Sequence, residues 1–143
     1  MTWNGSPGRV VFWRSLTTAP TIPVSEWTGP TGFATGRDDL PDEGKGSYGA
    51  GSLPITGMGM VDILFHPTFA AGTSGRRIAR VSLNGNNIGQ DEDTSSSICS
   101  VLVATPAFVK PGDVLAFEVF QAGVAGGLAL GTGPGSYISV LSR

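Results

Sequence analysis

Residues 75–90 constrain the fold most, because this stretch encodes a complete β-hairpin. Up to Leu83, two sets of side chains alternate with the period of a strand: Arg77, Ala79, Val81 and Leu83 on one face, and Arg76, Ile78, Arg80 and Ser82 on the other. Asn84-Gly85 follows, and this dipeptide readily accepts the positive φ angles of a tight turn. Residues 86–90 can then return along the first strand, so the stretch predicts an antiparallel sheet.

The rest of the chain indicates more strands around this hairpin. Its 22 glycines and 10 prolines favour short strands joined by turns and argue against helices. We predict an all-β sandwich of eight to ten short strands, with an acidic, hydroxyl-rich loop at 91–97 and a turn at 110–113. The further strands are expected at residues 9–14, 21–27, 53–55, 61–65, 98–105, 114–121, 126–131 and 136–141.

The first 50 residues differ from the others in composition. They hold Pro7, Pro20, Pro23, Pro30 and Pro41 and all three tryptophans, Trp3, Trp13 and Trp27. Prolines at this density are typical of edges, turns and extended segments, and disordered tails seldom carry so many aromatic residues. We therefore predict an extended N-terminal arm over 1–50, with one or two strands, and a sandwich domain over 51–143. Alternatively, the tryptophans cap the core of the domain itself.

Length and charge limit the kind of protein. A chain of 143 residues fits one domain that buries roughly two-thirds of its unfolded surface. Nine basic residues against eleven acidic ones give no electrostatic reason to expect nucleic acid or an anionic membrane as partner. We see no signal peptide and no apolar window of the ~20 residues that a membrane span needs. Because only 14% of the residues are charged, we expect part of the surface to be covered by other subunits.

No group of residues predicts catalysis. The single Cys99 lies in an apolar run and the single His66 precedes Pro67, so neither a disulfide nor a catalytic triad can form within one chain. We expect no enzyme and no cofactor, and interpret Asp113 as a turn residue and Glu118 as an outward-facing acid. Two metal sites stay as weaker alternatives: His66 meeting its symmetry mates on a threefold axis, and Ca²⁺ at residues 91–93, otherwise a solvated acidic loop.

Arg76, Arg77 and Arg80 form the one basic cluster of the sequence. The leading interpretation is structural, as for most charged side chains on strands. A contact within a trimer and binding of an anionic cell-wall glycan are the alternatives. Together with Trp3, Trp13 and Trp27 these arginines are the candidate interaction residues.

The second part of the chain contains, in order, Gly57 with Val61, Ile63 and Phe65, then Gly75-x-Arg77, Asn84-Gly85, Pro111-Gly112-Asp113, Gln121 and Tyr137-x-Ser139. In this order and spacing, these motifs resemble the C1q/TNF-like jelly rolls, in particular those of bacteriophage minor tail and capsid-associated proteins. The resemblance covers residues 52–143, with departures at Gly59 and at the terminal residues 141–143. It implies a ten-stranded jelly roll that forms a homotrimer on the virion surface.

Two functions follow as expectations from this resemblance. The first is a structural virion protein, assembled in the host cytoplasm: a trimeric capsid decoration or minor capsid protein that stabilises or decorates the head. Its partners would be the major capsid protein or other virion subunits. The second is a tail-associated module that recognises a host surface glycan through its loops. The short chain without heptad repeats favours the first, and so do the loops at 70–75 and 91–97, which contain no aromatic residue.

Overall fold

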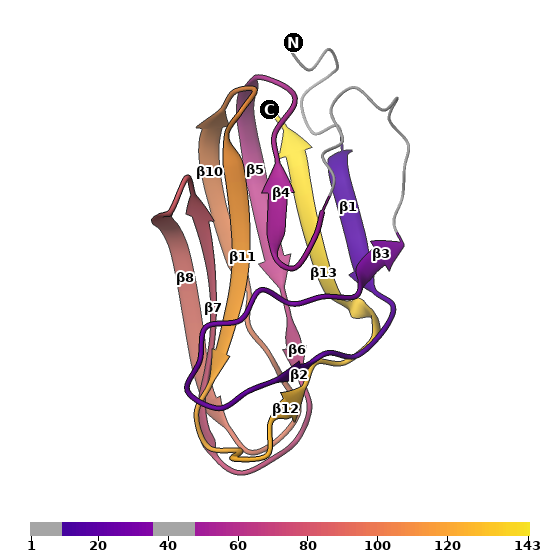
Figure 1. The fold of residues 1–143 in the computed structure, drawn as a ribbon, viewed down its shortest axis with the longest axis vertical. Helices are drawn as coiled ribbons and strands as arrows, with labels where there is room; N and C mark the ends of the chain where they lie inside the picture. Colours follow the sequence, from indigo (N-terminus) through magenta and orange to yellow (C-terminus); the bar gives the residue numbers. More distant parts are fainter. Residues whose placement is uncertain (1–9, 36–47) are drawn as a thin grey trace.

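The computed structural model describes residues 10–35 and 48–143, and all regular structure in this part of the chain is β. The predicted all-β fold is confirmed (Figure 1). The strands are β1 (Val10–Leu16), β2 (Thr21–Ile22), β3 (Phe33–Thr35), β4 (Ser52–Pro54), β5 (Gly59–His66), β6 (Thr68–Phe69), β7 (Gly75–Leu83), β8 (Asn86–Ser95), β9 (Cys99–Ser100), β10 (Val103–Val109), β11 (Val114–Gln121), β12 (Leu128–Ala129) and β13 (Gly133–Ser142).

Two antiparallel sheets form the layers of a sandwich. One has five strands in the order β10-β5-β13-β1-β3, and the other has four in the order β4-β11-β7-β8. In Figure 1, β4 and β11 lie in front of β5, and the short pairs β12-β2 and β6-β9 lie at the lower end. Neighbours in each sheet are often distant in sequence, as in a jelly roll. The sandwich therefore presents two outward faces, one for each sheet.

Strict alternation along the long strands builds the core between the layers. On β11, Leu115, Phe117 and Val119 are buried while the residues between them are partly exposed. On β5, Val61, Ile63 and Phe65 are buried in the same way. The rings of Phe65 and Phe117 meet edge to face across the layers, 5.4 Å apart at 74°. A period of two thus places the apolar half of each strand between the sheets.

The predicted hairpin is present, and its second strand is longer than expected. Asn84 and Gly85 have φ angles of 50° and 84°, as a tight two-residue turn requires. However, β8 continues to Ser95, so the loop predicted at 91–97 is mostly strand. β8 is an edge strand whose side chains are largely exposed on both faces, and such a strand leaves no alternating pattern to detect.

The single strand predicted at 98–105 is two elements in the structure. β9 pairs with β6, whereas β10 joins the five-stranded sheet beside β5. Between them, Val101 donates its N–H to the Pro67 carbonyl. The apolar run is continuous in sequence, but the chain changes sheets within it.

The described part of the predicted arm belongs to the sandwich. β1 lies between β13 and β3 in the five-stranded sheet, and Phe12, Leu16, Ile22 and Phe33 are core residues. Over residues 10–35 the chain is therefore not a separate extended arm. The remaining parts of that prediction, residues 1–9 and 36–47, lie outside the described residues.

Candidate functional site

The outward face of the five-stranded sheet is rich in apolar side chains. We call it the apolar face; it comprises Trp13, Met60, Leu64, Ala104, Pro106, Phe108, Tyr137 and Leu141. Phe108 and Met60 are register partners on β10 and β5, and 56% of Phe108 and 39% of Met60 are exposed. Asp62 lies on the same face and pairs with Arg143 at 3.0 Å. Exposed apolar patches on protein surfaces commonly mark sites of association, so this face is the candidate interface.

Three rings stack at one end of the apolar face. The Tyr137 ring lies 5.0 Å from His66 and 6.4 Å from Trp13, both nearly parallel to it. His66 also contacts the Gly135 carbonyl through Nδ1 at 2.7 Å, so this nitrogen carries the proton and donates. His66 is thus half-buried and held in place, rather than a freely solvated turn residue.

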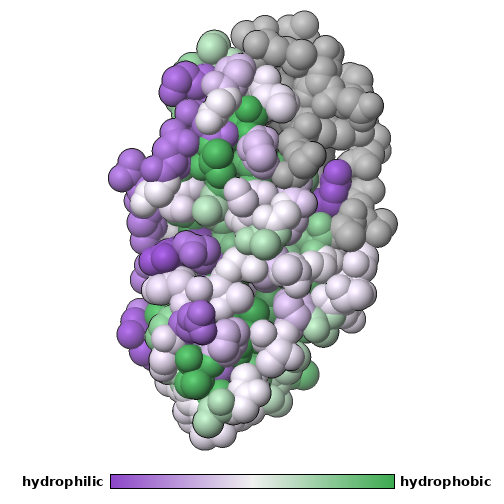
Figure 2. Space-filling model, viewed as in Figure 1, coloured by the Kyte–Doolittle hydropathy of each residue, from purple (hydrophilic) through white to green (hydrophobic). Residues whose placement is uncertain are grey.

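The outward face of the four-stranded sheet is polar and internally paired. Arg76 contacts Glu92 at 2.9 Å, and Arg80 contacts Glu118 at 3.0 Å, each across neighbouring strands. Figure 2 views the molecule as in Figure 1 and shows hydrophilic residues along the margin over β8. Glu118 faces outward, as its parity predicted. The Arg76–Glu92 contact raises the pKa of the arginine and lowers that of the carboxyl through their hydrogen bond.

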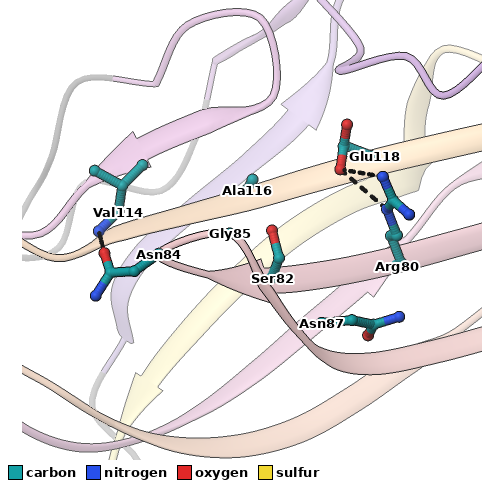
Figure 3. Close-up of a pocket in the computed structure, with 8 residues that line it drawn as sticks. All are labelled: Arg80, Ser82, Asn84, Gly85, Asn87, Val114, Ala116 and Glu118. Atoms are coloured by element: carbon teal, nitrogen blue, oxygen red, sulfur yellow. Dashed lines mark hydrogen bonds and ion pairs between the residues drawn. The ribbon is translucent and has the colours of Figure 1, made fainter.

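A groove of about 450 Å³ runs along this face (Figure 3). We call it the polar groove; its lining residues are Arg80, Ser82, Asn84, Gly85, Asn87, Val114, Ala116 and Glu118. The Arg80 guanidinium donates from both Nε and Nη2 to a single oxygen of Glu118, Oε1. It also lies over the Trp27 ring, 3.7 Å from the ring centre. The indole and the carboxylate together fix the arginine.

Hydrogen bonds between the hairpin turn and the start of β11 close the other end of the polar groove. Asn84 accepts from the Val114 N–H and donates to Asp113, both at 2.9 Å. Asp113 also accepts from the Lys110 N–H and ammonium, which gives it the turn-fixing role that was predicted. These hydrogen bonds, the one from Asn84 above all, lower the pKa of the Asp113 carboxyl.

The structure separates the predicted arginine cluster. Arg76 and Arg80 lie on the outward face, but Arg77 has the opposite parity and is fully buried. Its Nη2 donates to the Thr73 carbonyl at 2.8 Å, and Nη1 reaches the carbonyls of Arg76 and Ala122 at 3.5 Å. Its Nε has no hydrogen-bond partner in the described part of the chain. Arg77 therefore cannot be a surface interaction residue, and its position beside Ala79 and Val81 in the alternation already indicated this.

The two described tryptophans lie on different faces of the sandwich. Trp13 lies on the apolar face beside Tyr137, whereas Trp27 packs 5.3 Å from Phe120 on the four-stranded sheet. Both are half-buried. Trp3 lies outside the described residues. Sequence reasoning therefore found Trp27 and Arg80 but not their contact, because no local pattern links residues 27, 80 and 118.

The acidic run at 91–93 is divided between the two faces of β8, as consecutive strand residues must be. Glu92 pairs with Arg76, while Asp93 accepts a hydrogen bond from the Thr94 N–H. Within residues 10–35 and 48–143, no three potential metal ligands come together. Cys99 is partly exposed, and its partial burial, followed by the charge of Asp93, raises the pKa of its thiol. None of the described elements is a helix of the length and apolarity needed to cross a membrane.

Comparison with known proteins gives a likeness of fold. No family of known proteins and no curated protein matches the sequence. Among solved structures, an Eiger TNF from S. frugiperda superposes with a TM-score of 0.67 at 12% identity, covering 96% of this chain and 94% of the other. Murine APRIL at pH 8.5 gives a TM-score of 0.66 at 14% identity, covering 96% of this chain and all of the other. Murine APRIL at pH 5.0 gives 0.63 at 11% identity, with the same coverage. The fold is a TNF-like jelly roll, as the sequence motifs predicted.

Proposed function

We propose that this chain is a structural protein of a bacteriophage virion that assembles as a homotrimer and decorates or stabilises the head. The jelly-roll fold supports this, because the C1q/TNF-like domains that the sequence resembles are trimeric and, in phages, lie on the virion surface. The major capsid protein or another virion subunit is the partner that we propose for the assembled trimer. The site of action is then the virion, after assembly in the host cytoplasm.

The apolar face carries the trimer proposal. Phe108 and Met60 are register partners on β10 and β5, and Leu141 lies on the next strand, β13, opposite Asp62; the surface that they share has few charges. An isolated subunit would expose these side chains to water, whereas a subunit interface would bury them at about 25 cal/mol per Å² of apolar area. Among the described residues, Asp62 and Arg143 form an ion pair on this face, so these two charges add no net repulsion between copies.

The experiment for the virion role is immunogold electron microscopy of virions from the phage that encodes this chain. The proposal expects gold on the head surface at many positions. Gold confined to the tail would move the chain to the alternative role, and unlabelled virions would overturn both. Removal of residues 1–9, including Trp3, would test whether that segment anchors the trimer: it should abolish virion binding while the jelly roll stays folded.

The second candidate function is recognition of a host surface glycan by a tail-associated module. One observation favours it: the polar groove lies on the four-stranded sheet, in the layer opposite the apolar face. A trimer that buries the apolar face leaves this groove in contact with solvent. The binding surface that this candidate needs is therefore a sheet face, and not the loops at 70–75 and 91–97 that the sequence suggested.

A further inference from the structure

We infer that the polar groove binds one residue of a neutral saccharide, with Arg80, Glu118 and Ser82 as its hydrogen-bonding side chains. The inference deepens the second candidate function and is independent of the trimer. The groove volume, about 450 Å³, lies within the ~300–1,000 Å³ typical of small-molecule sites.

The groove has hydrogen-bonding capacity that the described residues do not use. Both nitrogen contacts of Arg80 reach Oε1 of Glu118, so Oε2 keeps its lone pairs for a ligand hydroxyl. Ser82 lies on the floor, and its hydroxyl has no partner among residues 10–35 and 48–143. In Figure 3, Glu118 and Arg80 lie at one end of the groove, Val114 and Asn84 lie at the other, and Ser82 lies between them. A pair of adjacent sugar hydroxyls, each both donor and acceptor, matches an acceptor carboxylate beside a donor guanidinium.

The balanced charges of the groove favour a neutral ligand. Arg80 and Glu118 cancel each other, and the remaining lining residues are uncharged. A phosphate or sulfate would meet the Glu118 carboxylate, and a cation would meet the Arg80 guanidinium. Val114 and Ala116 supply small apolar surface against which the C–H face of a pyranose ring can pack.

The backbone argues against a peptide as occupant. An extended peptide binds a sheet by adding a strand to a free edge. At the groove, β11 is already paired with β4 and β7, and β7 is paired with β8. An aromatic base is also disfavoured, because the guanidinium of Arg80 occupies one face of the Trp27 ring.

The side chains of Arg80 and Glu118 are held in place before any ligand binds. Only 28% of the Arg80 side chain and 28% of the Glu118 side chain are exposed. The Trp27 ring and the carboxylate fix the guanidinium, so little side-chain entropy is lost on binding.

NMR titration of the full chain tests the inference, with methyl galactoside, methyl glucoside and N-acetylglucosamine as neutral probes. N-acetylneuraminic acid and glucosamine are the anionic and cationic probes. We expect at least one neutral sugar to shift the Arg80 Nε–H and the Ser82 and Asn87 amides, with a dissociation constant of about 1 mM, typical of weak single-sugar contacts. The absence of shifts in the groove with all three neutral sugars, or tighter binding of either charged probe, would overturn the inference.

Matched variants distinguish sugar binding in the polar groove from binding elsewhere on the four-stranded sheet. Glu118→Gln should weaken the sugar at least about tenfold, the cost of losing one charge-assisted hydrogen bond. Glu92→Gln removes the carboxylate of the other ion pair on the same face, outside the groove, and should leave the affinity unchanged. Equal effects of the two variants would contradict the assignment. Should Glu118→Gln fail to fold, Ser82→Ala removes the free hydroxyl and should also weaken binding. Light scattering on the same samples reports the trimer separately.

Discussion

The two outward faces of this sandwich differ in how their side chains are satisfied. On the four-stranded sheet, Arg76 and Arg80 meet carboxylates on neighbouring strands of the same chain. On the five-stranded sheet, Phe108 and Met60 lie side by side and are exposed to solvent. The same fold thus presents one face suited to water and one suited to another protein surface. The proposed trimer would therefore bury the face of the five-stranded sheet, and the proposed ligand would bind the face of the four-stranded sheet.

The largest effect is expected from placing a charge on the apolar face. Phe108→Asp should weaken trimer formation at least about thirtyfold, the equivalent of a ~2 kcal/mol interface hot spot, because it buries an unpaired carboxylate. Thr94→Asp, an exposed site on β8 of the other sheet, is the matched control and should leave the oligomer intact. Sedimentation velocity over a dilution series measures both. Equal behaviour of the two variants would remove the distinction between the faces.

The next effect concerns Arg77, the one arginine of the hairpin that lies on neither outward face. Arg77→Met keeps a long side chain but leaves the Thr73 carbonyl without its donor. We expect a loss of about 1–3 kcal/mol in the free energy of unfolding, the cost of an unsatisfied buried polar group. Urea denaturation measures it, with Arg76→Met as the exposed control. A loss no greater than that of the control would show that the buried guanidinium does not stabilise the fold.

Asp113 should make the closed end of the polar groove sensitive to acid. Its pKa is lower in the folded chain than the ordinary value of about 3.9, so its ionised form stabilises the fold above that value. This contribution is lost as the pH falls through the lowered pKa. Asp113→Asn should therefore lower the thermal midpoint at pH 7, and the difference from the native chain should shrink below pH 4. A difference that does not change with pH would exclude the carboxylate as its source.

The smallest expected effect is a difference in coupling energy between the two ion pairs on the outward face of the four-stranded sheet. A double-mutant cycle on Arg80 and Glu118 should give a coupling of about 0.5–1 kcal/mol, because the pair is partly shielded from water. The Arg76–Glu92 pair is more exposed, at 55% and 43%, and its coupling should be smaller and disappear in high salt. Calorimetric midpoints of the single and double variants supply both cycles. The reverse order would mean that shielding does not determine the strength of these pairs.

Short sequence patterns predicted the strands and turns whose conformation is determined by neighbouring residues. Alternation identified β11 and β7, Asn84-Gly85 predicted the hairpin turn, and Pro111-Gly112-Asp113 predicted the turn before β11. β8 beyond Gln90 was missed because an edge strand exposed on both faces has no buried side to alternate with a polar one. The parity of Arg77 differs from that of Arg76 and Arg80, but the prediction of one arginine cluster did not use this difference and was wrong for Arg77.

The candidate surfaces depend on the register in which the strands pair, and this register cannot be read from the sequence. Glu118 meets Arg80 because β11 and β7 pair at those residues, 38 positions apart in the chain. Phe108 and Met60 become neighbours through the pairing of β10 with β5. Trp27 reaches Arg80 because the chain after β2 returns to the edge of β11, where Thr28 bonds with Val119. Each of these contacts joins segments that no short motif connects.

The native mass of the chain tests the central claim, that the apolar face is a subunit interface. Multi-angle light scattering at micromolar concentration, on the full chain, should give one species at three times the 14.7 kDa mass of a single chain. Phe108→Asp should shift that species towards the single-chain mass while its β-sheet circular dichroism is unchanged. A native chain that elutes as a 14.7 kDa monomer across the dilution series would contradict the account.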